Sequence, residues 1–158
     1  MLINNVPVLD ESIMNDFHAK AIKSVRKRSA HHLHENGDYL NQSFNWILKD
    51  SYMQPHCHAS IEKIEQINLV KGELDVIFFN DHGDIIKVFN LNLPQRETVV
   101  IPAFQYHTYI VKTDFAVTFE TMEGIYDPKD WKQFPNWAPQ EGKDESINYF
   151  EKLRNKIS

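Results

Sequence analysis

The hydrophobic pattern changes its period partway along the chain. Apolar residues first recur at helical spacing, at Ile13, Met14, Phe17, Ala21 and Val25. Asp10 or Ser12 can cap the helix that this spacing predicts. From Ser43 onward, short runs of β-branched and aromatic residues are separated by turn signals, which is typical of an all-β sandwich or barrel. We therefore expect an N-terminal helix packed on the outside of a β domain.

The predicted strands are short and closely spaced. In the first, Phe44, Trp46 and Leu48 alternate with polar or smaller residues. Further runs follow at 64–70, 73–79, 85–91, 99–101, 107–111 and 115–121. Turn signals lie at Lys71-Gly72 and at 81–84, where we expect His82 to face solvent. Because this spacing leaves no room for crossover helices, we expect an antiparallel sheet.

Positive charge and histidine are concentrated in residues 26–34, between the helix and the first predicted strand. The histidines there have no carboxylate or cysteine at ligand spacing and no apolar frame, so we interpret the segment as a solvated linker. They are His31, His32 and His34. Arg26 and Arg28 remain candidates for binding an anionic substrate.

The stretch after Pro55 has the spacing of half a metal site. His56 and His58 are separated by one residue, so on an extended strand both imidazoles point the same way and can reach one ion. Glu65 shares a strand face with the apolar residues two and four positions later, where an unpaired carboxylate is costly to desolvate. This pattern indicates that a cation compensates its charge. Cys57 points to the opposite face and is expected to pack.

A third histidine can complete the site. His107 follows Pro102 and begins another predicted strand, so it can return to the same ion if the strands between close into a barrel. Glu62 is an alternative to Glu65, but it precedes the β run and more easily faces solvent. The predicted ligands of one divalent metal ion (Zn, Fe, Mn, Ni or Co) are His56, His58, Glu65 and His107.

Composition excludes several classes of function. The 158 residues suit one domain, and their formal charge of −5 comes without a Lys/Arg stripe, which argues against nucleic-acid binding. Cys57 is the only cysteine, so an internal disulfide is impossible and a reducing cytoplasm fits. The apolar runs are too short to span a bilayer, and no membrane association is expected.

The last part of the chain predicts a packed extension and a helix. Residues 126–142 carry too many aromatic residues and prolines for a free tail, and they either seal an apolar edge or also wall the metal pocket. An amphipathic helix follows, with apolar positions at Ile147, Phe150, Leu153 and Ile157. Asp144 or Ser146 can cap it, and it can pack on the barrel or across a homodimer. We predict a single domain, 1–158, with helix and linker at 1–41, a barrel at 42–122 and the tail at 123–158.

These motifs carry a family resemblance. Two motifs of this chain are similar to those of cupins. The first is a His-x-His pair followed by a glutamate, six residues and a glycine. The second is a later Pro-x4-His. More narrowly, most of the chain resembles the WbuC family of cupin-fold metalloproteins. The matching segments are Arg26-Lys27-Arg28, Pro55 to His58, Glu62 to Glu65, Gly72, Ile101 to Thr108, 124–128 and 137–139. Two positions differ from the pattern of the family. Cys57 stands where the family often has a basic residue between the two histidines, and Phe104 stands where it usually has a glycine before the last histidine.

The resemblance implies a cupin-type β-barrel (a double-stranded β-helix or jelly roll) with a bound divalent metal, and a place in bacterial polysaccharide (O-antigen) gene clusters. The resemblance does not supply a reaction. Our first hypothesis is a metal-dependent enzyme that acts on a small polar substrate such as a sugar or sugar nucleotide, of isomerase, epimerase or oxygenase type. Its candidate catalytic residues are Lys63 and Tyr109, and its candidate substrate-binding residues are Arg26, Arg28 and Lys63. Lys63 has the alternative of a simple ion pair with Glu62 or Glu65. The other hypotheses are a non-catalytic module that binds or senses a small ligand, and a scaffold whose metal only stabilises the barrel.

Overall fold

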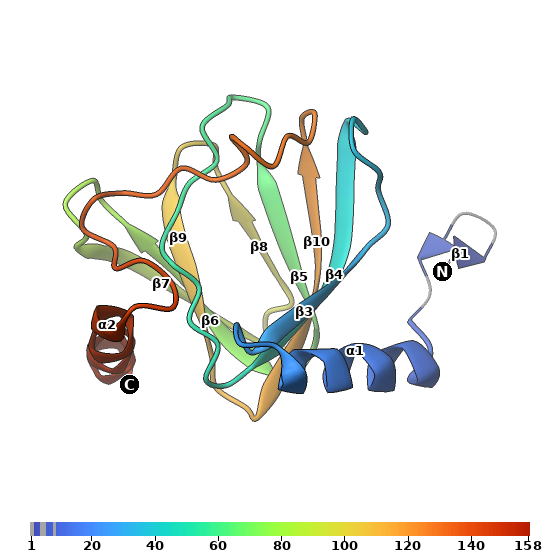
Figure 1. The fold of residues 1–158 in the computed structure, drawn as a ribbon, viewed down its shortest axis with the longest axis horizontal. Coiled ribbons are helices and arrows are strands. Elements are labelled where there is room, and N and C mark those ends of the chain that lie inside the picture. Colours follow the sequence, from blue (N-terminus) through green and yellow to red (C-terminus); the bar gives the residue numbers. More distant parts are fainter. Residues whose placement is uncertain (1, 4–5, 8) are drawn as a thin grey trace.

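Two antiparallel β-sheets face each other, with one helix at each end of the chain (Figure 1). The computed structural model describes residues 2–3, 6–7 and 9–158. Its elements are β1 (Leu2–Ile3), β2 (Val6–Pro7), α1 (Glu11–Lys23), β3 (Arg28–His32), β4 (Leu40–Leu48), β5 (Glu65–Lys71), β6 (Glu73–Phe79), β7 (Ile85–Asn92), β8 (Thr98–Ile101), β9 (Tyr106–Val111), β10 (Phe115–Glu123) and α2 (Asp144–Ile157). The all-β prediction with a helix on either side is confirmed.

The larger sheet has the strand order β3-β4-β10-β5-β8, and the smaller has β7-β6-β9. β1 and β2 pair only with each other. Every pairing is antiparallel, as the short connections predict. The predicted strands from 64 to 121 all form, with ends shifted by at most two residues. Period-two alternation is a local property, so the sequence alone locates these strands well.

The interpretation of residues 26–34 as a solvated linker is wrong. Arg28–His32 forms β3, the edge strand of the larger sheet, with Ser29 opposite Trp46 and His31 opposite Phe44. On one side of the strand, His31 packs against the ring of Phe17 with ring centroids 4.9 Å apart. The other side faces a polar cavity. Both faces of β3 therefore carry polar or small residues, and this conceals the usual alternation of a strand.

α1 begins where the sequence predicts. The carboxylate of Asp10 accepts a hydrogen bond of 2.9 Å from the backbone N–H of Ile13, so Asp10 rather than Ser12 is the cap. The helix buries Ala21 against Trp46 and Val117 of the larger sheet. Val25 was expected on the packed face, but the helix ends at Lys23 and Val25 is 96% exposed.

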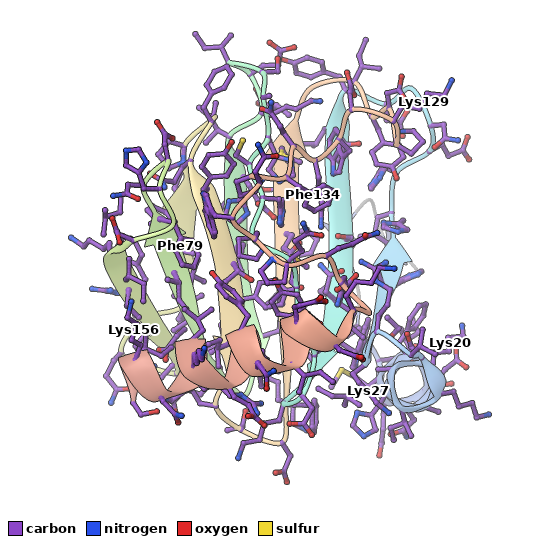
Figure 2. All side chains as sticks on the ribbon, turned by 60° about the vertical axis from the view of Figure 1, so that its left-hand side comes forward. Lys20, Lys27, Phe79, Lys129, Phe134 and Lys156 are labelled. Carbon is purple, nitrogen blue, oxygen red and sulfur yellow. The ribbon has the colours of Figure 1, made fainter. Side chains whose placement is uncertain are left out.

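α2 lies on the outer face of the smaller sheet, and Figure 2 shows it crossing the front of the molecule. Phe150 and Leu153 pack there against Ile77, Phe79 and Ile110. Two details of the predicted helix are wrong. Lys143 occupies the N-cap position without a side-chain cap, so neither Asp144 nor Ser146 caps the helix, and Ile147 is 61% exposed. None of the helices in the described part of the chain has the length and apolarity needed to cross a membrane.

Candidate metal centre

Three buried histidines meet between the two sheets. His56 pairs with His107 through two backbone hydrogen bonds, of 3.1 and 2.9 Å, which bring the loop before β5 against the start of β9. One ring nitrogen from each of His56, His58 and His107 lies within 4.8 Å of the other two. All three side chains are at least 97% buried. The predicted return of His107 to the His56–His58 pair is what the structure shows.

Each imidazole is oriented by a backbone carbonyl. The Nδ1 atoms of His56 and His107 lie 3.0 and 2.8 Å from the carbonyl oxygens of Gln54 and Gln105, respectively. For His58 the partner is the carbonyl oxygen of Trp131, at 2.6 Å. A carbonyl can only accept, so each Nδ1 carries the proton and donates it. The Nε2 lone pairs are thereby left for a metal, which is the arrangement common in metal-binding histidines.

Glu65 joins the histidines from the start of β5. Its Oε2 lies 3.1 Å from Nε2 of His107 and 3.3 Å from Nε2 of His58. Within the described residues, neither His58 Nε2 nor Glu65 Oε2 has a hydrogen-bond partner, although both atoms are buried. Lone pairs that face each other in a buried site repel unless a positive charge lies between them. The four side chains therefore fit a bound cation.

The protonation states also suit metal binding. Burial lowers the pKa of His56 well below its usual value, and the charge of Lys132 adds to the effect, so this imidazole is neutral near pH 7. Burial alone would raise the pKa of Glu65. The imidazoles of His107 and His58, whose Nε2 atoms lie 3.1 and 3.3 Å from this carboxylate, outweigh burial and hold the pKa of Glu65 well below its usual range. Neutral imidazoles and an ionised carboxylate are the forms that ligate divalent metals.

The competing carboxylate lies elsewhere. Glu65 shares the buried face of β5 with Ile67 and Leu69, whereas Glu62 is exposed in the preceding turn. Cys57, between the two histidines, is 2% exposed and points away, with its Sγ 3.8 Å from the side-chain oxygen of Gln133. His82 is exposed at the tip of the β6–β7 turn. These positions match the predictions made for all three residues.

The candidate ligands lie in a cavity of about 490 Å³. Its floor is the inner face of the larger sheet, where polar side chains such as Ser43, Asn45 and Glu120 stand near Ile67. The segment after β10 runs across one end of both sheets before it reaches α2 (Figure 1). Its residues Tyr126, Pro128, Lys129, Trp131, Lys132 and Phe134 line the cavity. The tail therefore walls the pocket as well as covering an edge; Lys129 and Phe134 are labelled in Figure 2.

Both predicted substrate-binding arginines line the cavity, and both are already paired. Glu141 of the tail accepts from Nε of Arg26 at 3.0 Å and from Nη2 of Arg28 at 2.5 Å. Nη1 of Arg28 also donates to the hydroxyl of Ser51 and the carbonyl of Tyr52. These contacts give Arg28 a structural role at the base of the tail.

The two predicted catalytic residues differ in position. Tyr109 of β9 is buried and lines the cavity, and burial raises the pKa of its phenol, so the hydroxyl keeps its proton. Lys63 is buried too, but it is not among the cavity-lining residues. Its Nζ lies 3.6 Å from Asp130 and 4.8 Å from the ring centroid of Trp131. Lys63 thus pairs with Asp130 rather than with Glu62 or Glu65, and it supports the tail.

Two ionisable groups in the cavity were missed in the sequence. Burial, helped by the charge of Glu65, raises the pKa of Glu120 to about 8, while Thr118 donates to it over 2.9 Å. Burial lowers the pKa of Lys132 to about 8. Glu120 could have been found, because it follows Ala116 and Thr118 at the inward positions of β10. Lys132 lies in a segment without periodicity and carried no such signal.

Phe104 lies in the turn before β9 and adopts a left-handed backbone conformation. Its φ is +64°, a region that glycine occupies freely and phenylalanine does not. Its N–H donates to the carbonyl of His58 at 3.0 Å, and its side chain is 56% exposed. The turn therefore keeps the geometry that suits glycine although the residue is phenylalanine.

The chain has a cupin-type fold and a candidate metal centre. The chain belongs to a family described as a domain of unknown function, DUF6016, which matches residues 9–91. No curated protein matches the chain. The narrower resemblance to the WbuC family is not established by these findings.

Solved structures share the fold at low identity. Protein SO0799 from Shewanella oneidensis is 10% identical with a TM-score of 0.60, over 76% of this chain and 82% of that one. The capsular polysaccharide assembling protein CapF from Staphylococcus aureus is 22% identical with a TM-score of 0.60, over 71% of this chain and 32% of its own length. A cupin 2 conserved barrel domain protein from Rhodopseudomonas palustris is 12% identical with a TM-score of 0.51, over 79% and 73%. These likenesses concern the fold, and this chain spans about a third of CapF.

Proposed function

We propose that this chain is a metal-dependent enzyme of the cupin fold that acts on a small polar substrate. The observation that carries the proposal is the convergence of buried atoms without partners, His58 Nε2 and Glu65 Oε2, on a polar cavity. His56, His58, His107 and Glu65 would hold one divalent ion. Four protein ligands leave room for substrate oxygen on a metal that takes five or six ligands.

A bound metal would supply a Lewis acid, or an activated water or oxygen. The surrounding residues define what the substrate meets. Tyr109 keeps its hydroxyl proton and can donate a hydrogen bond to a substrate oxygen. Asn45 and Ser43 on the cavity floor can both donate and accept, which suits a molecule rich in hydroxyl groups.

We propose a sugar or sugar nucleotide as this substrate, in the assembly of a bacterial surface polysaccharide. The name of CapF, a capsular polysaccharide assembling protein, supports this assignment through a shared fold. The resemblance of the motifs to the WbuC family supports it independently. A cytoplasmic location and a homodimer are also proposed, to be tested by cell fractionation and light scattering.

A non-catalytic module that binds or senses a small ligand is the alternative. The position of Lys63 favours it, because one of the two predicted catalytic groups pairs with Asp130 outside the cavity lining. Such a module needs the same metal and the same polar walls. It differs only in leaving its ligand unchanged.

Elemental analysis of protein purified without added metal tests the proposal first. We expect about one divalent ion per chain in the wild type and in His82→Ala, and much less in His58→Ala. Sugar nucleotides and small carboxylates are then screened by thermal shift, and those that bind are assayed for conversion by mass spectrometry. A wild type without metal contradicts the proposal, and binding without conversion would favour the non-catalytic module.

A further inference from the structure

The cavity contains one lysine that is surrounded by protein but has no carboxylate beside it. Lys132 comes from the tail, and its Nζ makes a contact of 3.7 Å with Sδ of Met53. Among the described residues, no Asp or Glu oxygen lies within 4.0 Å of this Nζ. A thioether is a weak acceptor, and an ammonium group has three donors. Most of the donor capacity of Lys132 is therefore left for the cavity.

The other charged side chains of the cavity are engaged, apart from Lys129, which is exposed at the cavity rim. Arg26 and Arg28 share the carboxylate of Glu141. Glu65 faces the histidines. Glu120 accepts a hydrogen bond from Thr118, and because burial raises its pKa to about 8, it is largely protonated near pH 7 and supplies no full negative charge. A buried ammonium without a counter-ion is costly, because charge is poorly solvated there. None of the described residues places an anionic group next to Lys132 to offset this cost.

We infer that Lys132 binds an anionic group of the ligand, a carboxylate or a phosphate, while other oxygens of the same ligand reach the metal centre. The inference rests on the proposed function and narrows its substrate class to acidic or phosphorylated small molecules. Lys132 is then a substrate-binding residue. With a pKa of about 8, lowered by burial, it is mostly charged at pH 7 and can hold an anion.

The position of Lys132 also fits a ligand that spans both groups. Lys132 lines the same cavity as the four candidate metal ligands. Its charge is also one of the causes that lower the pKa of His56. Trp131, beside it in the chain, supplies the carbonyl that orients His58. The same short segment therefore orients a metal ligand and presents a positive charge to the cavity.

Matched sugars test the inference on metal-loaded protein. Glucose is neutral, glucuronate adds a carboxylate and glucose 1-phosphate adds a phosphate. Calorimetry should show at least about tenfold tighter binding of one acidic sugar than of glucose by the wild type. The preferred acid shows whether the anionic group is a carboxylate or a phosphate. Lys132→Met should lose this preference at unchanged metal content, and Lys132→Arg should keep it.

Lys129→Met is the control, because Lys129 lies on the same tail but is exposed at the cavity rim. We expect it to change the preference by less than about twofold. A Lys132→Met protein that retains metal, thermal midpoint and preference overturns the inference, as does a wild type that binds glucose as tightly as it binds both acidic sugars. If Lys132→Met does not fold, Lys132→Gln is measured in its place under the same criteria.

An additional pair of probes separates this inference from the sugar assignment. Both glycolate and ethylene glycol have two carbons, and glycolate carries a carboxylate where ethylene glycol carries a second CH2OH group. If no sugar binds but glycolate binds in a Lys132-dependent way, the inference stands and the sugar assignment fails. If glycolate does not bind better than ethylene glycol and no acidic sugar binds, the inference itself is overturned.

Discussion

The inner faces of the strands are polar at one end of the molecule and apolar at the other. Along β5 the buried positions run from Glu65 through Ile67 to Leu69. Along β9 they run from His107 through Tyr109 to Val111. The apolar end is closed by core residues such as Leu74, Leu91 and Ala116, which are fully buried, together with Ile47, Val76 and Val99.

This contrast shows how a small protein can hold unpaired charge in its interior. Burial of the apolar end supplies stabilisation, at roughly 25 cal/mol per Å² of apolar surface removed from water. The polar end keeps histidine, carboxylate and ammonium groups that a stable core would otherwise exclude. We therefore expect changes at the two ends to have separable effects, on stability at one end and on ligand binding at the other.

The largest expected effect is the loss of metal from ligand variants. His56→Ala and His107→Ala should each lose most of the bound metal, because each removes one Nε2 donor from the site. His31→Ala and His82→Ala should lose none. Metal-to-protein ratios measured side by side decide the matter. An empty site in the His82 variant and a full one in the His56 variant would contradict the assignment.

The apolar end should respond in the opposite way. Leu74 is fully buried in the main core, and Leu74→Ala should lower the free energy of unfolding by about 2–5 kcal/mol. Its folded fraction should bind metal at the wild-type ratio. Denaturant titration and elemental analysis measure the two quantities.

Removing the metal is the complementary change. Chelation should leave the β circular dichroism intact at room temperature, since the apolar end does not depend on the ion. Loss of the β circular dichroism signal on chelation would show that the stability of the apolar end depends on the metal end.

A smaller effect separates the two carboxylates. Glu65→Gln keeps the shape but removes the charge that offsets the ion in a poorly solvated site, so metal affinity should fall at least about tenfold. Glu62→Gln, in the exposed turn, should leave it unchanged. A metal competition titration at one pH near neutrality compares them. Wild-type affinity in the Glu65 variant with a large loss in the Glu62 variant would refute the assignment.

The smallest effect concerns the turn beside the metal end. Phe104→Gly should stabilise the protein by about 0.5 kcal/mol, because glycine adopts the φ of +64° with less strain but gains more freedom in the unfolded chain. Urea titration measures the change. Gly72→Ala is the opposite case: φ is +84° there and an added Cβ would lie 2.4 Å from the carbonyl oxygen of Phe115, so it should destabilise. A destabilised Phe104→Gly would indicate that the phenyl ring makes packing contacts worth more than the strain.

The sequence was sufficient where one local rule decides the outcome. Strand alternation places Glu65 inward and Glu62 in solvent, and the same rule puts Cys57 opposite its neighbours. His56, His58 and His107 converge because the strands between them are short and antiparallel. Each of these inferences needs only the period of two and the rough strand boundaries.

The rule failed where a strand faces a polar cavity. β3 has no apolar stripe to read, since Arg28 and His32 line the cavity and Ser29 donates to the carbonyl of Phe17 at 2.6 Å. Lys132 was missed for another reason. Its position depends on how the irregular tail docks, through the backbone pairing of Cys57 with Gln133, and no sequence period encodes that contact.

The carbonyl that orients His58 distinguishes it from the other two histidines. His56 and His107 each find their carbonyl two residues earlier, at Gln54 and Gln105, whereas His58 depends on Trp131. The orientation of His58 is therefore tied to the docking of the tail, whereas the other two imidazoles are oriented within their own loops. A change that undocks the tail would free one of the three imidazoles and open the cavity wall at the same time.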